Sequence, residues 1–116
     1  MVDNSATVVV DTTDGGDRVV RATGSLDDEN AYLLEEALDK ADASSPPLVV
    51  ADLSGLTFAD STVLHVLLRA RGRCRASGGR LVIAGPLDGV VGRLFEVTGT
   101  REAFSFAETV EAALSR

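Results

Sequence analysis

Two short, uninterrupted apolar runs constrain the fold of this chain more than any other feature. PLVVADLSG (residues 47–55) and RLVIAG (residues 80–85) are each bounded by turn-forming residues, which is typical of strands covered on both faces. Between them, apolar residues recur with helical spacing over residues 61–77, with Leu67 at the centre of the apolar face. A strand–helix–strand order predicts a right-handed parallel crossover, so we expect the two runs to be central strands of one sheet.

The N-terminal segments predict a hairpin followed by a helix. Residues 7–11 and 18–24 have the composition of strands, and the glycine-containing turn at residues 14–17 separates them. A helix should follow the hairpin, with Ser25 or Asp27 as its cap and acidic residues in its first turn.

The C-terminal third continues the alternation of strands and helices. Val90, Leu94 and Val97 form the apolar face of a third helix, residues 104–106 an extended segment, and residues 109–116 a short helix. The sequence therefore predicts an α/β fold in which a mixed, mostly central-parallel β-sheet is accompanied by about four helices.

Length and composition are those of one small domain with an aliphatic core. The 116 residues fit a single domain, residues 1–116, and 45% of them are hydrophobic while only 4% are aromatic. The net charge of −7 argues against direct DNA binding, because contacts to phosphates require positive charge. Arg69, Arg71, Arg73 and Arg75 fan around the predicted helix, and we expect them to form its solvated carbonyl end.

The cysteine and histidine content limits which cellular compartment and which metal sites can be expected. Cys74 is the only cysteine and cannot form an internal disulfide, which favours a reducing compartment. We see no signal peptide and no apolar run near the ~20 residues that span a bilayer, so we expect a cytoplasmic protein without a membrane span. One histidine and one cysteine cannot form a histidine-rich or cysteine-rich metal site, and glycine-rich phosphate motifs are absent. We therefore expect no metal and no cofactor.

Ser61 and His65 are the only pair that suggests catalysis. They are four residues apart and would share one face of a helix, so His65 could act as a base for Ser61. No oxyanion hole or third group can be named, so we favour a surface histidine and predict no catalytic residue. In the simplest interpretation, Asp60 or Ser61 only caps the helix.

Ser61 is also well placed for phosphorylation, because it lies at the boundary between a loop and a helix. A phosphate adds a charge of about −1.5 to −2 at pH 7. Helix N–H groups favour that charge, whereas the neighbouring Asp60 repels it. Val63 and Val66 widen the apolar face beyond one core contact, so we expect them in a docking surface.

The central run VVADLSGLTFADSTVLHVLL (residues 49–68) carries a family resemblance. It resembles the centre of STAS domains, and specifically of bacterial anti-sigma factor antagonists, which have a hydrophobic strand, Asp-Leu-Ser, then Asp-Ser and a leucine-containing helix. Gly24-Ser25-Leu26-Asp27 is similar to the family's Gly-x-Leu-Asp entry to the first helix, and GGRLVIAGP and VGRLFEVTG also fit. The resemblance covers nearly the whole chain and implies a STAS-like domain.

The resemblance also implies a function in partner switching. Such an antagonist binds an anti-sigma factor that is itself a serine kinase, and binding frees the sigma factor. The kinase uses ATP to phosphorylate the serine after the motif's Asp, the phosphorylated antagonist dissociates, and a phosphoserine phosphatase resets it. In this chain the phosphorylated residue would be Ser61, with Thr62 as the second candidate. The implied partner-binding residues are Asp27, Asp60, Ser61, Thr62, Val63, His65 and Val66.

Two positions depart from the family pattern and leave alternatives open. The family commonly has glycine where this chain has Val63 and His65, which implies a different docking surface. One alternative is a STAS module without a switch, which binds a nucleotide or serves as a subunit of a lipid-transport system. The other is a small hydrolase that uses Ser61 and His65.

Overall fold

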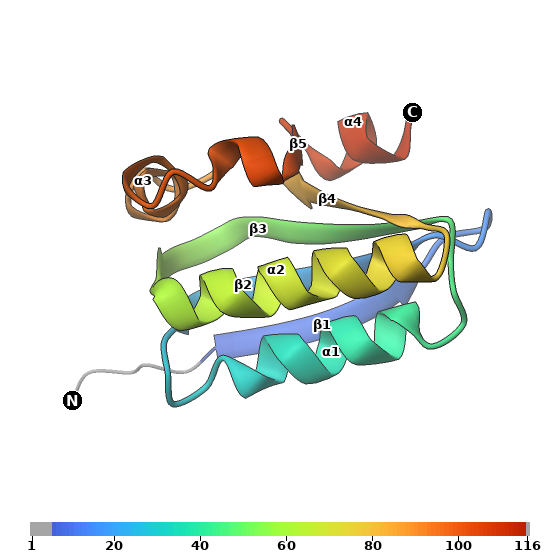
Figure 1. The fold of residues 1–116 in the computed structure, drawn as a ribbon, viewed down its shortest axis with the longest axis horizontal. Coiled ribbons are helices and arrows are strands. Elements are labelled where there is room, and N and C mark those ends of the chain that lie inside the picture. The colour runs from blue at the N-terminus through green and yellow to red at the C-terminus, as the bar shows by residue number, and fades with distance from the viewer. Residues whose placement is uncertain (1–5, 116) are drawn as a thin grey trace.

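One five-stranded sheet forms the centre of the computed structural model, which describes residues 6–115 (Figure 1). The strands lie in chain order, and only the first pair is antiparallel. The elements are β1 (Ala6–Thr12), β2 (Arg18–Leu26), α1 (Tyr32–Asp42), β3 (Leu48–Ala59), α2 (Ser61–Ala76), β4 (Arg80–Ala84), α3 (Gly89–Val97), the 3₁₀ turn η1 (Arg101–Ala103), β5 (Ser105–Ala107) and α4 (Val110–Leu114). This architecture confirms the predicted α/β fold class. The predicted domain limits, at residues 1 and 116, lie outside the described residues.

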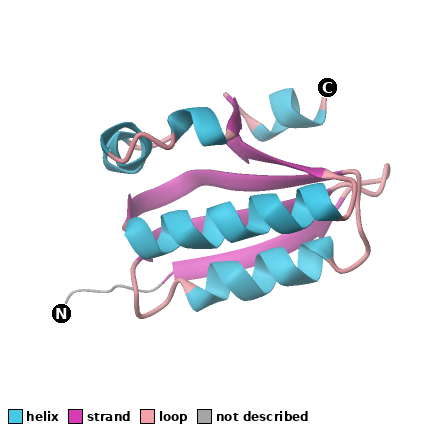
Figure 2. Cartoon of the chain, viewed as in Figure 1, coloured by secondary structure: helices cyan, strands magenta, loops and turns pink. Residues whose placement is uncertain are grey.

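Helices cover both faces of the sheet, which explains why the central strands are apolar throughout. Figure 2 shows α1 and α2 side by side on one face, and α4 packs on the other face against β3, β4 and β5. In β3, Val49 and Ala51 belong to the core beneath α1 and α2, whereas Leu48 and Val50 belong to the core beneath α4. Alternate side chains of one strand therefore fill two separate cores.

β3 is longer than the sequence pattern indicated. The predicted strand ended at Gly55, but β3 continues to Ala59. Beyond Asp52 it has no partner in β4, yet it stays paired with β2 as far as the register pair Leu26–Ala59. Two register shifts in the β2–β3 ladder interrupt the alternation of buried and exposed residues, so no period-two signal marks this part of the strand.

α1 begins later than predicted. Neither Ser25 nor Asp27 caps it, since the helix follows Ala31 and has no side-chain cap. Asp27 instead opens a separate turn, in which its carbonyl oxygen accepts hydrogen bonds from the N–H groups of Asn30 (3.3 Å) and Ala31 (2.9 Å). The residues between the hairpin and α1 therefore form a compact loop.

The buried face of α3 differs by one position from the predicted one. Val90, Leu94 and Val97 were expected to face the core. Leu94 is partly buried and packs against it, but Val90 is 52% and Val97 is 69% exposed. Val91 and Phe95 are buried instead. The ring of Phe95 packs edge to face against two other phenylalanine rings, at centroid distances of 5.5 and 5.2 Å. Burial of a phenyl ring in such a cluster contributes more favourable free energy than burial of a valine side chain. This difference sets the rotation of α3 about its own axis.

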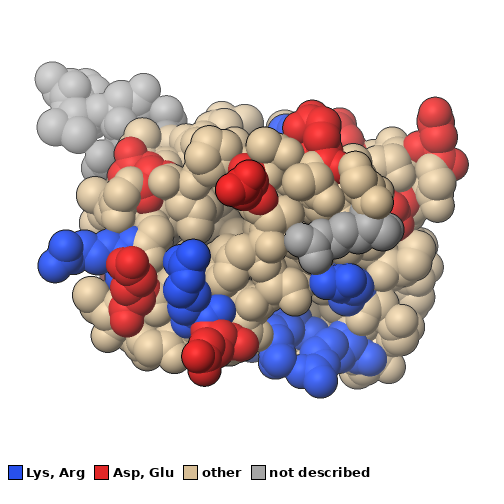
Figure 3. All heavy atoms as spheres, turned by 90° about the horizontal axis from the view of Figure 1, so that it is seen from above, with Lys and Arg blue, Asp and Glu red and all other residues tan. Residues whose placement is uncertain are grey.

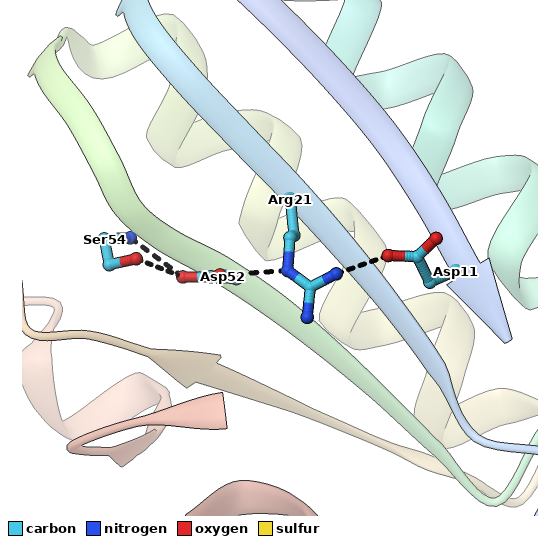
Figure 4. Close-up of polar contacts among 4 residues, drawn as sticks. All are labelled: Asp11, Arg21, Asp52 and Ser54. Atoms are coloured by element: carbon cyan, nitrogen blue, oxygen red, sulfur yellow. Dashed lines mark hydrogen bonds and ion pairs between the residues drawn. The ribbon is translucent and has the colours of Figure 1, made fainter. Parts of the chain in front are cut away.

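The Asp-Leu-Ser motif connects strands on the sheet face that carries α4 (Figure 4). Oδ1 of Asp52 accepts hydrogen bonds from the backbone N–H (3.0 Å) and the hydroxyl (2.7 Å) of Ser54. Its Oδ2 lies 3.5 Å from Nε of Arg21, the register partner of Asp52 in β2. Arg21 also pairs with Asp11 in β1. These polar side chains therefore link three strands.

We expect Leu67→Ala to lower the free energy of unfolding by ~2–5 kcal/mol, because truncation leaves a cavity at a position that is 0% exposed. Chemical denaturation followed by circular dichroism measures this change. Val97→Ala is a matched control on an exposed helix position, and its effect should stay within about 0.5 kcal/mol. Unchanged stability of Leu67→Ala would mean that α2 packs through another face.

We expect the Cys74 thiol to be unreactive in the native protein. Burial raises its pKa from 9.0 to about 11, and the charge of Asp42 acts in the same direction, so the reactive thiolate is scarce at neutral pH. A chromogenic disulfide reagent at pH 8 should label Cys74 slowly before and rapidly after denaturation. Because the unfolded chain releases the proton first, this group's contribution to stability is present below pH 9 and is lost as the pH rises towards 11. Cys74→Ala should reduce that pH dependence, and rapid native labelling would contradict the buried position.

Candidate functional site

The pairing of β2 with β3 brings two acidic residues together. Leu26, the last residue of β2, is the register partner of Ala59, the last residue of β3. Asp27 follows β2 and begins the loop before α1, whereas Asp60 is the single residue between β3 and α2, so both lie at the same edge of the sheet. Neighbouring strands are ~4.8 Å apart. The register therefore places Asp27 and Asp60, two of the residues predicted for the site, at the same edge of the sheet.

Asp60 is the capping residue of α2. Its backbone is extended (φ −111°, ψ −172°), and its Oδ1 accepts hydrogen bonds from the N–H groups of Thr62 (2.9 Å) and Val63 (3.4 Å). This resolves the choice between Asp60 and Ser61 that the sequence left open. The carboxylate also places negative charge at the positive end of the helix dipole.

Ser61 is the first residue of α2, and its side chain is exposed. Within residues 6–115 its hydroxyl forms no hydrogen bond, because Asp60 has taken the capping role. Thr62 is half-buried, and its N–H donates to Asp60. Of the two hydroxyls, that of Ser61 is therefore the more accessible to an approaching enzyme.

His65 is exposed one helical turn after Ser61. No hydrogen bond joins the two side chains in the structure, and neither bonds to any other side chain within residues 6–115. A serine nucleophile needs a base that is itself held in position by a third group. The described residues provide no such group, so the geometry does not favour the hydrolase.

Val63 and Val66 are not on the surface as predicted. They are 0% and 1% exposed and belong to the core beneath α2. The wide apolar face of the helix is needed because α2 contacts both the sheet and α1. Neither valine side chain can contact a partner in this conformation, which corrects their assignment to a docking surface.

The loop that begins at Asp27 adds negative charge beside Ser61. Oδ1 of Asp27 accepts a hydrogen bond from the N–H of Glu29 (3.0 Å), and Oδ1 of Asn30 accepts one from the N–H of Asp27 (2.8 Å). The carboxylates of Asp27, Asp28 and Glu29 lie within 4.8 Å of one another. Exposed acidic groups are not by themselves a metal site, but they make this edge of the protein negative.

Two exposed aromatic residues flank the site and were missed in the sequence. Phe58 is 42% exposed, and its register partner Ser25 lies two residues before Asp27. Tyr32 is 56% exposed and opens α1 directly after the acidic loop. Exposed aromatic side chains at the edge of a site are typical of protein interfaces. A period-two pattern could not indicate Phe58, because a register shift precedes it in the ladder.

Comparison with known proteins identifies the family. The STAS domain family matches residues 8–113, and the chain belongs to that family. The structure is similar to that of an anti-sigma factor antagonist from Mycobacterium paratuberculosis, with 29% identity, a TM-score of 0.87 and coverage of 98% of this chain and 95% of that chain. It shares its fold with the Bacillus cell fate determinant SpoIIAA in the phosphorylated form, at 20% identity and a TM-score of 0.71, covering 95% and 98% of the two chains. It also shares its fold with part of the murine Slc26a9 anion transporter, at 13% identity and a TM-score of 0.67, covering 97% of this chain and 22% of that one.

Within residues 6–115, no helix combines the length and the apolar character that crossing a membrane requires.

We expect Asp60→Ala to destabilise the protein by ~1 kcal/mol, because two N–H groups of α2 lose their acceptor. Asp60→Asn keeps the acceptor oxygen and removes the charge, so it should retain most of that stability. Thermal and chemical denaturation of both variants measure the difference. Equal destabilisation by both would mean that the charge of Asp60, and not its hydrogen bonds, stabilises the helix.

Proposed function

We propose that this protein is an anti-sigma factor antagonist, a binding protein whose partner is an anti-sigma factor with serine kinase activity. Binding would release the sigma factor, and phosphorylation of Ser61 would end the complex. The similarity to the Mycobacterium paratuberculosis antagonist supports the general role. The observation that carries the switch is the exposed Ser61 hydroxyl, which has no hydrogen bond within residues 6–115 and stands at the start of a well-packed helix.

The proposed docking surface surrounds Ser61 at this edge of the sheet. Of the residues predicted from the sequence it includes Asp27, Asp60, Ser61, Thr62 and His65. Phe58 and Tyr32 add apolar area at its margin, whereas Val63 and Val66 support α2 from the core. The acidic loop should favour a partner with basic residues, because complementary charge guides association and fixes the register of a complex.

A phosphate on Ser61 would remain a strong local charge. The first free N–H groups of α2 normally stabilise an anion at a helix start, but here those of Thr62 and Val63 already bind Asp60. A phosphate of about −1.5 to −2 charge would therefore lie next to a carboxylate without full compensation. A partner surface shaped for a neutral hydroxyl would have to bury that charge, which weakens binding.

The departures from the family's glycine pattern affect this surface less than the sequence suggested. Val63 points into the core, so it occupies no space where a partner would dock. His65 is exposed and does change the surface, so it should influence which partner is chosen. In this proposal the protein acts in the cytoplasm, and a phosphoserine phosphatase would restore its unmodified form there. The protein itself would neither catalyse a reaction nor contact DNA.

We expect Ser61→Ala to abolish phosphorylation by the partner kinase while partner binding is preserved. Only an exposed hydroxyl is lost, and the cap is provided by Asp60. Ser61→Asp should weaken binding, though less than a phosphate, because a carboxylate carries one charge and fewer acceptor oxygens. Incubation with kinase and ATP, site mapping by mass spectrometry and a binding titration measure both effects.

Thr62→Val is the matched control, because it removes the adjacent hydroxyl and leaves Ser61 intact. Phosphate should still be found on Ser61 in this variant. The proposal is wrong if a kinase that binds the protein modifies only Thr62 or modifies neither residue. A STAS module without a switch would then be the better interpretation, and the fold shared with part of an anion transporter is compatible with that role.

A further inference from the structure

β1 is an edge strand whose outer side is unpaired in the described part of the chain. It comes first in the strand order, so within residues 6–115 only β2 pairs with it, and Figure 1 shows it on the side of the sheet away from β5. Natural proteins usually protect such an edge with a lysine, a proline, a bulge or a very short strand. β1 has seven residues, contains neither lysine nor proline, and pairs with β2 without a register shift. Its outer backbone groups are therefore able to pair with another strand.

A groove lies beside this edge, between β1 and α1. It has a volume of about 340 Å³. Its lining residues are Val8 and Val10 of β1 and Leu33, Glu36, Ala37 and Lys40 of α1. The two valines are half-buried and pack against the core beneath α1 and α2. The edge strand and the groove therefore form one partly apolar surface.

The two charged side chains of the groove have no ion-pair partner within residues 6–115. Glu35 and Asp39 lie on the inner side of α1, where both form ion pairs with arginines of α2. Glu36 and Lys40 line the groove on the other side and form no such pair. An acid and a base one helical turn apart complement a helix that presents the same two charges in the opposite order. A second copy of α1 in antiparallel orientation presents that order.

We infer that two copies of this chain associate through their β1 strands, so that two five-stranded sheets join into one of ten strands. A two-fold axis perpendicular to the sheet at Val9 makes the two β1 strands antiparallel and keeps both α1 helices on the same face. Val9 then lies opposite Val9 of the second copy, and Val8 lies opposite Val10. Apolar cross-strand pairs of this kind stabilise a ladder.

No like charges face each other along the paired strands. Asp11 is the only charged residue of β1, and the two-fold axis places it opposite Thr7 of the second copy. The two Asp11 residues are four positions apart, about 13 Å along the strands. Each is already paired with Arg21 of its own copy. The strand is therefore complementary to itself.

The position of α1 also fits this arrangement. α1 packs on β1 and β2, so a helix axis centred on that pair lies half a strand spacing inside β1. The two-fold axis lies half a strand spacing outside β1. With ~4.8 Å between strands, the two α1 axes are then about 10 Å apart, which is the distance of packed helices. Glu36 of each copy faces Lys40 of the other, and the groove is filled.

The opposite edge of the sheet is less suited to pairing. β5 has only three residues. Figure 3 views the molecule from above Figure 1, where β5 and α4 lie, and shows acidic and basic side chains spread over that side. Association through β1 alone closes at two copies, whereas pairing through both edges would extend into a fibre.

The dimer leaves the proposed docking surface open. Ser61 follows the end of β3, and the two-fold axis reverses the strand direction, so the two Ser61 side chains lie at opposite ends of the dimer. The inference does not depend on phosphorylation of Ser61 or on an anti-sigma factor partner.

Sedimentation velocity of the intact chain tests the dimer. We expect a shift from one copy to two between about 5 and about 200 µM, because an interface of this size is small. Val9→Lys places like charges directly opposite each other at the two-fold axis and should weaken association at least about tenfold. Val97→Lys is the matched control. It adds the same charge at an exposed valine of α3, and it should change the dissociation constant less than about twofold.

A charge exchange on α1 provides a second test at exposed helix positions, which remains valid if Val9→Lys fails to fold. Glu36→Lys leaves two bases on the groove side of each helix, and Lys40→Glu leaves two acids. Each variant alone should associate more weakly than the unmodified chain, because like charges meet across the axis. An equimolar mixture of the two variants should recover the association, because each helix then meets its opposite.

Backbone amide NMR spectra recorded on dilution locate the interface. Shift changes should cluster at residues 6–12 and 33–40 and leave residues 60–62 unchanged. The inference is overturned by a single copy at every concentration, which would assign the edge to a different partner. It is also overturned by species larger than two copies, by equal weakening in Val97→Lys, by no recovery in the mixture, or by shift changes centred on another surface.

Discussion

The long parallel ladder between β2 and β3 determines where everything else in this protein lies. It runs from the pair Arg18–Val49 to the pair Leu26–Ala59, so nine residues of β2 span the same length as eleven residues of β3. Two register shifts absorb the difference of two residues, 11 − 9. As a result both strands end level, and the acidic loop after β2 emerges beside Asp60, the residue that joins β3 to α2. Without these shifts Asp60 and Ser61 would be displaced from Asp27.

Gly55 makes one of the shifts possible. A Cβ atom at this position would lie 2.6 Å from Cγ2 of Thr23 and 3.2 Å from the carbonyl oxygen of Ala22. No other residue type allows the two strands to approach this closely. Asp52 and Ser54 hold the same region through their hydrogen bonds and the contact with Arg21. Residues 52–55 (Asp-Leu-Ser-Gly) therefore help to position the site residues at the ends of β2 and β3, but they contribute no side chain to the surface of the site.

The sequence was sufficient for the features that depend on strong, local patterns. Apolar runs with no polar face predicted the central strands, and the helical row centred on Leu67 predicted the buried side of α2. The sequence was insufficient where two apolar patterns competed for the buried face of one helix. In α3, Phe95 faces the core and Val97 does not, because the ring of Phe95 packs in the phenylalanine cluster. Val66 shows the same limit, since its burial depends on the packing of α2 against elements from other segments of the chain.

The site itself was predictable in its residues but not in their roles. An Asp-Ser pair before an apolar helix indicates a cap, but the pattern does not say which of the two residues provides the acceptor. The extended backbone of Asp60 decides this, and it leaves the Ser61 hydroxyl free. Phe58 was not predictable, because its exposure depends on a register shift that the sequence does not mark.

The two ends of α2 carry opposite charges, and the helix dipole stabilises both. Asp60 and the acidic loop lie at the positive N-terminal end, whereas Arg73 and Arg75 occupy the last turn at the negative end. Separation of charge along the helix therefore costs little folding free energy. It leaves an acidic surface at one end of α2 and a basic surface at the other. Because α2 is packed along its length on the sheet, a partner that binds at the Ser61 end should not need to displace the end that carries the arginines.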